Sequence, residues 1–65
     1  MRIKINGEYS ETQARTIAQL LRELRTPPVG VAVAVNGQVV RKAEHDTTPL
    51  SESDEIELIH AVQGG

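Results

Sequence analysis

The chain has 65 residues, a formal net charge of −2 and no cysteine, and Tyr9 is its only aromatic residue. This length allows one domain at most, and without disulfides or a Cys/His metal cluster its fold depends on regular secondary structure and aliphatic packing. A nucleic-acid-binding module is disfavoured, because charges of both signs are scattered and no basic patch with stacking aromatics is present.

The apolar segments do not indicate a membrane or secreted protein. The longest apolar run, residues 29–35, is too short to span a bilayer, and residues 1–4 lack the apolar core of a signal peptide. We therefore expect a soluble, cytoplasmic protein, and the lack of cysteine is compatible with a reducing compartment.

Residues 1–5 alternate between apolar and basic side chains, which predicts a half-buried β-strand. Asn6-Gly7 follows, a strong signal for a type I′ hairpin turn, because both residue types tolerate a positive φ. We expect the returning strand to run from Glu8 to about Thr12.

Residues 16–25 predict the main helix. Thr16 can cap its first turn, and Gln19 three residues later completes a capping-box pattern. Arg22 and Arg25 suit the C-terminal end of a helix dipole, and Pro27-Pro28 prevents continuation. The helix has one apolar stripe, which we expect to lie in the core and which consists of Ile17, Leu20, Leu21 and Leu24.

The second half of the chain predicts another hairpin and a last strand. Residues 31–35 form a β-rich run, Asn36-Gly37 repeats the turn signal, and residues 38–41 return. Residues 42–55 are polar and irregular, and residues 56–62 form the closing strand.

A hairpin, a helix, a second hairpin and a closing strand in this order predict an α+β fold of the β-grasp type. We expect a mixed sheet of about five strands, with the first and last strands parallel at its centre and the helix packed across one face. A ferredoxin-like sandwich would need a second helix, for which residues 42–55 are too polar and interrupted. Residues 1–62 would form the domain, and residues 63–65 a flexible tail ending in Gly64-Gly65.

This order and the final Gly-Gly pair resemble the ubiquitin-like sulfur carriers, and most closely the ThiS family of thiamin thiazole biosynthesis. The resemblance covers nearly the whole chain. It rests on the segments Val31-Ala32-Val33-Ala34-Val35-Asn36-Gly37, Val39-Val40, Thr48-Pro49-Leu50, and Asp54 to Gly65. Two positions depart from the family pattern. Ser53 stands where such carriers often have glycine, which predicts a turn that is either more strained or differently shaped, and no aromatic residue lies near His45, within residues 42–48.

The resemblance implies a carrier protein rather than an enzyme. An E1-like adenylating enzyme would use MgATP to convert the Gly65 carboxylate to an acyl-adenylate. Sulfur from a donor such as a cysteine desulfurase would then give a C-terminal thiocarboxylate, the sulfur source for a thiazole synthase. The carrier itself would bind no cofactor or metal.

The residues at the tail suit this chemistry. An ionised α-carboxylate is a poor electrophile and needs activation by another protein. Glycine has no Cβ, so an extended tail of Gln63, Gly64 and Gly65 can thread a narrow channel. The alternative reading is a frayed terminus of small residues without a function.

The last strand also predicts a docking surface. Ile56 and Leu58 should face the core, which places Glu57, Ile59 and Ala61 on the opposite face. Together with two small residues of the neighbouring strand, these would form a shallow apolar patch that leads to the tail and binds the partner enzymes, made up of Ile59, Ala61, Val62, Ala32 and Ala34. An ordinary exposed aliphatic residue is the alternative.

Other polar residues are interpreted as structural. His45 and His60 have no metal-ligand spacing or nucleophile motif and are expected at the surface. The acidic segment at Glu52, Asp54 and Glu55 is expected to be a solvated turn.

Three other functions remain open at this stage. The same fold and ending occur in sulfur carriers for molybdopterin or another product. A ubiquitin-like modifier would instead be conjugated to lysine through Gly65. A plain β-grasp interaction module would tolerate loss of Gly64-Gly65.

Overall fold

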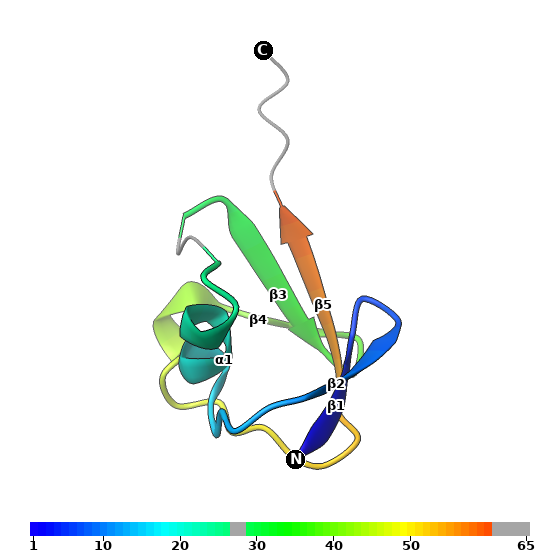
Figure 1. Ribbon diagram of the computed structural model, residues 1–65. Coiled ribbons are helices and arrows are strands. Elements are labelled where there is room, and N and C mark those ends of the chain that lie inside the picture. Colours follow the sequence, from blue (N-terminus) through cyan, green and yellow to red (C-terminus); the bar gives the residue numbers. More distant parts are fainter. Residues whose placement is uncertain (27–28, 61–65) are drawn as a thin grey trace.

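The structure is a computed structural model that describes residues 1–26 and 29–60. Within these residues, five strands form one mixed sheet in the order β2-β1-β5-β3-β4, and the helix α1 lies across one face (Figure 1). The first and last strands are parallel neighbours at the centre, with Lys4 paired to Glu55 and Ile5 to Ile56. The predicted β-grasp arrangement is confirmed.

Both predicted hairpins are present. Strand β1 (Arg2–Ile5) pairs antiparallel with β2 (Glu8–Glu11), and β3 (Val31–Val35) pairs antiparallel with β4 (Gln38–Val40). The φ angles at the two turns are positive at both central residues: 50° and 86° at Asn6-Gly7, 51° and 86° at Asn36-Gly37. These values identify type I′ turns, whose twist matches that of the strands they join.

The helix α1 (Ile17–Glu23) is shorter than predicted. Thr16 caps it, since its Oγ1 accepts a hydrogen bond from the Gln19 amide at 3.2 Å. The Gln19 side-chain oxygen accepts a hydrogen bond from the Arg15 amide at 2.8 Å. In a capping box it would accept from the amide of the N-cap residue, Thr16, instead. The prediction that Leu24 lies in the core was wrong, because its side chain is 40% exposed. The helix ends before Leu24, which is its C-cap residue, and the chain turns away at Arg25, whose φ is 56°.

The core lies between α1 and the sheet. Ile3, Ile17, Leu20, Val33 and Ile56 are its fully buried large side chains. Three of them come from the three central strands and two from the helix, so aliphatic contacts pack α1 against the middle of the sheet. A hydrogen bond from the Thr12 hydroxyl to the Glu23 carboxylate also ties the end of α1 to the chain after β2.

The segment after β4 folds back onto the helix. It contains a 3₁₀ helix, η1 (Lys42–Glu44), and the Ala18 amide donates to the His45 carbonyl at 2.9 Å. As a result His45 is buried, and its Nε2 lies 3.2 Å from the Val40 carbonyl oxygen. The prediction of a surface histidine was therefore wrong for His45, while His60 is exposed as expected.

The acidic turn before β5 (Glu55–His60) is held by specific hydrogen bonds. The Asp54 carboxylate accepts from the Ser51 amide at 2.8 Å and from the Asn36 side chain at 3.0 Å. Ser53 has a φ of 71°, a left-handed conformation that costs a residue with a Cβ free energy. Of the two alternatives predicted for this turn, the left-handed φ agrees with the more strained one.

No helix within residues 1–26 and 29–60 is long and apolar enough to cross a membrane.

Candidate functional site

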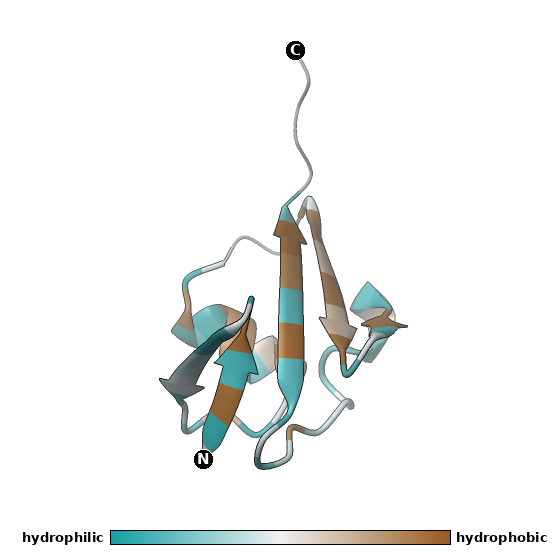
Figure 2. Cartoon of the chain, turned by 90° about the vertical axis from the view of Figure 1, so that its right-hand side faces the viewer, coloured by the Kyte–Doolittle hydropathy of each residue, from teal (hydrophilic) through white to brown (hydrophobic). Residues whose placement is uncertain are grey.

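Strand β5 separates the two faces of the sheet by its alternating side chains. Ile56 and Leu58 face α1 and are 1% and 9% exposed, whereas Glu57 and Ile59 are exposed on the face away from the helix, as predicted. Figure 2 looks at this open face, where β5 runs through the centre of the sheet with alternating polar and apolar bands.

An apolar patch lies on the open face near the C-terminal end of β5. Ala32 of β3 is the direct cross-strand partner of Ile59, and both are exposed, Ile59 by 58%. The predicted juxtaposition of these two residues is confirmed. An apolar group of a partner that covered Ile59 would bury a large part of its side chain.

Ala34 does not contribute to this patch as predicted. It lies on the open face but is only 7% exposed, because its short side chain sits between the longer side chains of its cross-strand neighbours, Glu57 and Val39. Val39 instead presents an apolar side chain that is 74% exposed on the same face. The sequence analysis did not predict Val39 as a surface residue. The strand alternation could have indicated it, because Val40 pairs with the core residue Val33 and the residue before it must therefore face the other side of the sheet.

We define the apolar patch of the structure as Ala32, Val39 and Ile59. Two of the predicted docking residues, Ala61 and Val62, lie outside the described residues. The same holds for the predicted domain boundary at residue 62 and for the predicted tail, Gln63, Gly64 and Gly65.

Strand β5 is held on both sides where it approaches this region. On one side β3 pairs with it as far as Val31 and His60. On the other, the ladder with β1 ends at Ile56, but the Asn6 side chain continues it by accepting a hydrogen bond from the Leu58 amide at 2.9 Å. The sheet therefore fixes the position and direction of β5 up to the residues that lead to the predicted tail.

The described residues contain no constellation typical of catalysis or metal binding. No group of three or more histidine, aspartate or glutamate side chains in residues 1–26 and 29–60 is placed to hold a metal ion. A cavity of about 280 Å³ lies between α1 and η1, with Leu21, Arg22 and His45 among its lining. Its histidine already contacts the Val40 carbonyl oxygen through Nε2.

Comparison with known proteins gives consistent results. The sequence model of the ThiS family matches residues 3–65. A sulfur carrier protein ThiS of Thermus thermophilus is 31% identical over 61 residues, which cover 94% of this chain and 95% of that protein. A thiazole synthase of Magnetococcus marinus is 38% identical over 66 residues, which cover 100% of this chain but only 20% of the synthase.

Solved structures agree with the sequence comparisons. The crystal structure of a thiamine biosynthesis protein (ThiS) from Geobacter metallireducens superposes with a TM-score of 0.85 and 26% identity, covering 100% of both chains. A solution structure of a thiamine biosynthesis protein from the same organism gives a TM-score of 0.81 over 100% of this chain and 88% of that one.

Proposed function

The chain belongs to the ThiS family of sulfur carrier proteins, and we propose that Gly65 is the residue through which it carries sulfur. Its biological role is that of a carrier in thiamine biosynthesis and not of a catalyst. The observation that supports Gly65 is the extent of the family match, which runs from residue 3 to residue 65 and so includes the Gly64-Gly65 pair.

The proposed chemistry takes place on the Gly65 carboxyl group. A partner adenylating enzyme uses MgATP, so that a carboxylate oxygen attacks the α-phosphate and pyrophosphate leaves. The terminal sulfur of a persulfide, such as that carried by a cysteine desulfurase, then attacks the carbonyl carbon, and AMP leaves to give an acyl disulfide. Two thiols of a reductant cleave its S–S bond, become a disulfide themselves and release the donor cysteine as a thiol. The product is a thiocarboxylate, in which one carboxyl oxygen has been replaced by sulfur. The absence of a side chain at Gly64 and Gly65 leaves that carbonyl open to attack.

The partner that accepts the sulfur is proposed to be a thiazole synthase. The Magnetococcus marinus relative supports this choice, because a segment similar to this whole chain forms part of a protein with that name. The apolar patch of Ala32, Val39 and Ile59 is proposed to dock against partner enzymes, since it lies on the open face and two of its residues, Ala32 and Ile59, are paired near the end of β5.

Intact-mass measurement tests the proposal. The protein is incubated with MgATP, a sulfur donor and the adenylating enzyme of the same organism, and the product is fragmented in the mass spectrometer. We expect a mass gain equal to the replacement of one oxygen by one sulfur, localised to Gly65. An unchanged mass with enzyme that is active on another carrier, and no adenylate at Gly65, would reject Gly65 as the carrying residue.

A further inference from the structure

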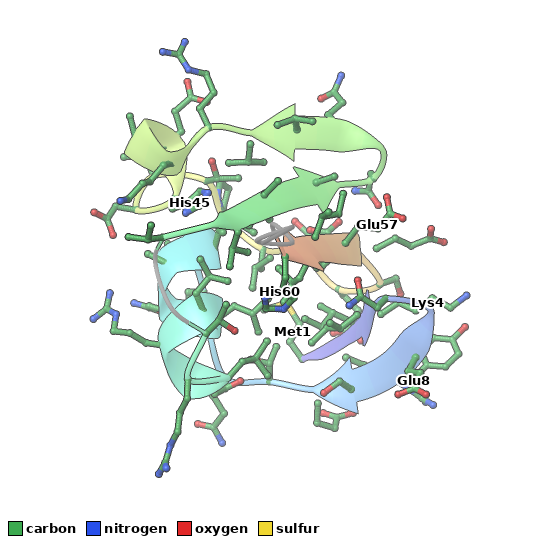
Figure 3. All side chains as sticks on the ribbon, turned by 90° about the horizontal axis from the view of Figure 1, so that it is seen from above. Met1, Lys4, Glu8, His45, Glu57 and His60 are labelled. Carbon is green, nitrogen blue, oxygen red and sulfur yellow. The ribbon has the colours of Figure 1, made fainter. Side chains whose placement is uncertain are left out.

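A second feature of the open face lies on the hairpin of β1 and β2. The guanidinium carbon of Arg2 is 4.6 Å, and the Lys4 ammonium nitrogen 5.2 Å, from the centre of the Tyr9 ring. Lys4 is the direct cross-strand partner of Tyr9, and Arg2 lies two residues before it on the same face. Figure 3 shows Lys4 and Glu57 pointing away from α1, on the side opposite to His45.

The two cations of this cluster have no carboxylate partner among residues 1–26 and 29–60. This is unexpected from the register, which places Glu11 opposite Arg2 and Glu55 beside Lys4. Both cations lie over the Tyr9 ring instead. A cation–π contact at an exposed site is weak and does not neutralise the charge, so the cluster presents two positive charges to a ligand.

Tyr9 does not belong to the hydrophobic core. Its side chain is 65% exposed, it is the only aromatic residue of the chain, and it packs on the solvent side of a sheet whose core is aliphatic. Tyrosine and arginine are the residue types enriched at the centres of protein–protein interfaces. The ring also restricts the two long side chains, which lowers the entropy lost when a partner orders them.

We propose that Arg2, Lys4 and Tyr9 form a second docking site, which binds carboxylate side chains on the surface of the thiazole synthase. This inference rests on the proposed function, because it identifies the second contact made by that partner. The first contact is the apolar patch on the same face. The two sites lie toward opposite ends of β5, since Lys4 is beside Glu55 at its start and Ile59 is near its end.

Two docking sites of different chemistry fix the orientation of the carrier. Along β5 the open face presents first Ile59 and then Glu57 and Glu55. Lys4 of the basic pair lies beside Glu55 on β1. Carboxylates of the synthase are repelled by Glu57 and Glu55 and attracted by Arg2 and Lys4. The carrier therefore docks in one rotational setting, with the direction of β5 defined relative to the synthase.

Binding of the full chain to the thiazole synthase from the same source tests this inference, by titration calorimetry and stopped-flow association at low and high salt. Arg2→Glu/Lys4→Glu is the main variant. Its matched control is Arg22→Glu/Lys42→Glu, which makes the same change in net charge at the cavity between α1 and η1, which both residues line. Tyr9→Phe keeps the ring, and Tyr9→Leu removes it.

We expect Arg2→Glu/Lys4→Glu to raise Kd by about tenfold or more, mainly through slower association, and to remove most of the salt dependence. Tyr9→Leu should also weaken binding, whereas Tyr9→Phe and the control pair should stay close to wild type. Thermal unfolding of each variant establishes that it is folded.

Equal weakening by both charge-reversed pairs would mean that only net charge matters and would overturn the inference, as would an unchanged Kd for Arg2→Glu/Lys4→Glu. Failure of the proposed function is a separate result. It would appear as the absence of a thiocarboxylate on the wild-type chain, whatever its affinity for the synthase. A wild-type chain that forms the thiocarboxylate but binds the synthase independently of Arg2, Lys4 and Tyr9 would refute this inference alone.

Discussion

The side chain of Asn6 accepts a hydrogen bond from the backbone amide of Leu58, 52 residues later in the chain, at 2.9 Å. A hairpin turn thereby continues the parallel ladder of β1 beyond its last backbone pair, Ile5 with Ile56. The residue that makes the turn also secures the strand that leads to the proposed carrying residue, so folding of the first hairpin and placement of β5 are coupled.

Asn6→Gly should lower the free energy of unfolding. Glycine adopts the φ of 50° easily, so the loss comes from the part-buried Leu58 amide, whose unmade hydrogen bond costs about 1–3 kcal/mol. Urea denaturation measures the change, and faster hydrogen exchange at Leu58 locates it. Asn6→Asp, which keeps an acceptor oxygen and tolerates this φ, should lose less. Equal losses for both variants would show that the acceptor is unimportant.

Ser53→Gly should stabilise the protein. The left-handed conformation costs serine about 1–2 kcal/mol, and glycine loses about 0.4–1 kcal/mol through its freer unfolded chain, which leaves a net gain centred on ~0.8 kcal/mol in a range of about 0–1.6 kcal/mol. The shift in urea midpoint measures it. Ser53→Ala, which keeps a Cβ at the same φ, serves as the control and should not stabilise. A lower midpoint for the glycine variant would contradict the strain argument.

His45→Ala should destabilise the fold by about 1–3 kcal/mol, because it removes a buried side chain and the hydrogen-bond partner of the Val40 carbonyl. The matched variant is His60→Ala, at an exposed position, which should change the free energy of unfolding by less than about 0.5 kcal/mol. Thermal or urea unfolding compares the two. Similar effects from both substitutions would mean that burial of His45 contributes nothing.

Ile59→Asp should weaken binding of the partner enzymes and leave the fold intact, because the side chain is exposed in the free protein. The expected loss is about 1.5–3 kcal/mol of binding free energy, the amount gained by covering such a side chain. Titration calorimetry with the adenylating enzyme and the thiazole synthase measures it. Val29→Asp changes an equally apolar, exposed residue before β3 and controls for the added charge. Wild-type affinity in Ile59→Asp would exclude the patch from docking.

Gly65→Ala should impair adenylation without changing stability. A methyl group beside the C-terminal carboxylate displaces the oxygen that attacks the α-phosphate, and a misplacement of about 1 Å can cost on the order of 100-fold in rate. Single-turnover assays that follow pyrophosphate release measure the effect, with unfolding curves as the control. Adenylation at the wild-type rate would show that glycine is not required at this position.

The order of the elements was predictable because each is specified by a local signal. Two Asn-Gly pairs between apolar runs define two hairpins, and the cap at Thr16 with the spacing of Ile17, Leu20 and Leu21 defines the helix. Strand alternation in residues 56–59 then places Ile59 on the open face. The strain at Ser53 was predictable only through the family pattern, since no local signal in the sequence requires a positive φ there.

The sequence by itself determined the β-grasp order, the aliphatic core and the polarity of the two faces of β5, because these depend on periodicity and turn chemistry over a few residues. Only the tertiary structure decided which polar and small residues are buried and which distant side chains come into contact. His45 is buried because η1 packs on α1, and Ala34 is covered by its cross-strand neighbours Glu57 and Val39. Arg2 and Lys4 converge on Tyr9 because the β1–β2 register brings them together. Such contacts depend on register and packing between segments distant in sequence, which no local pattern specifies.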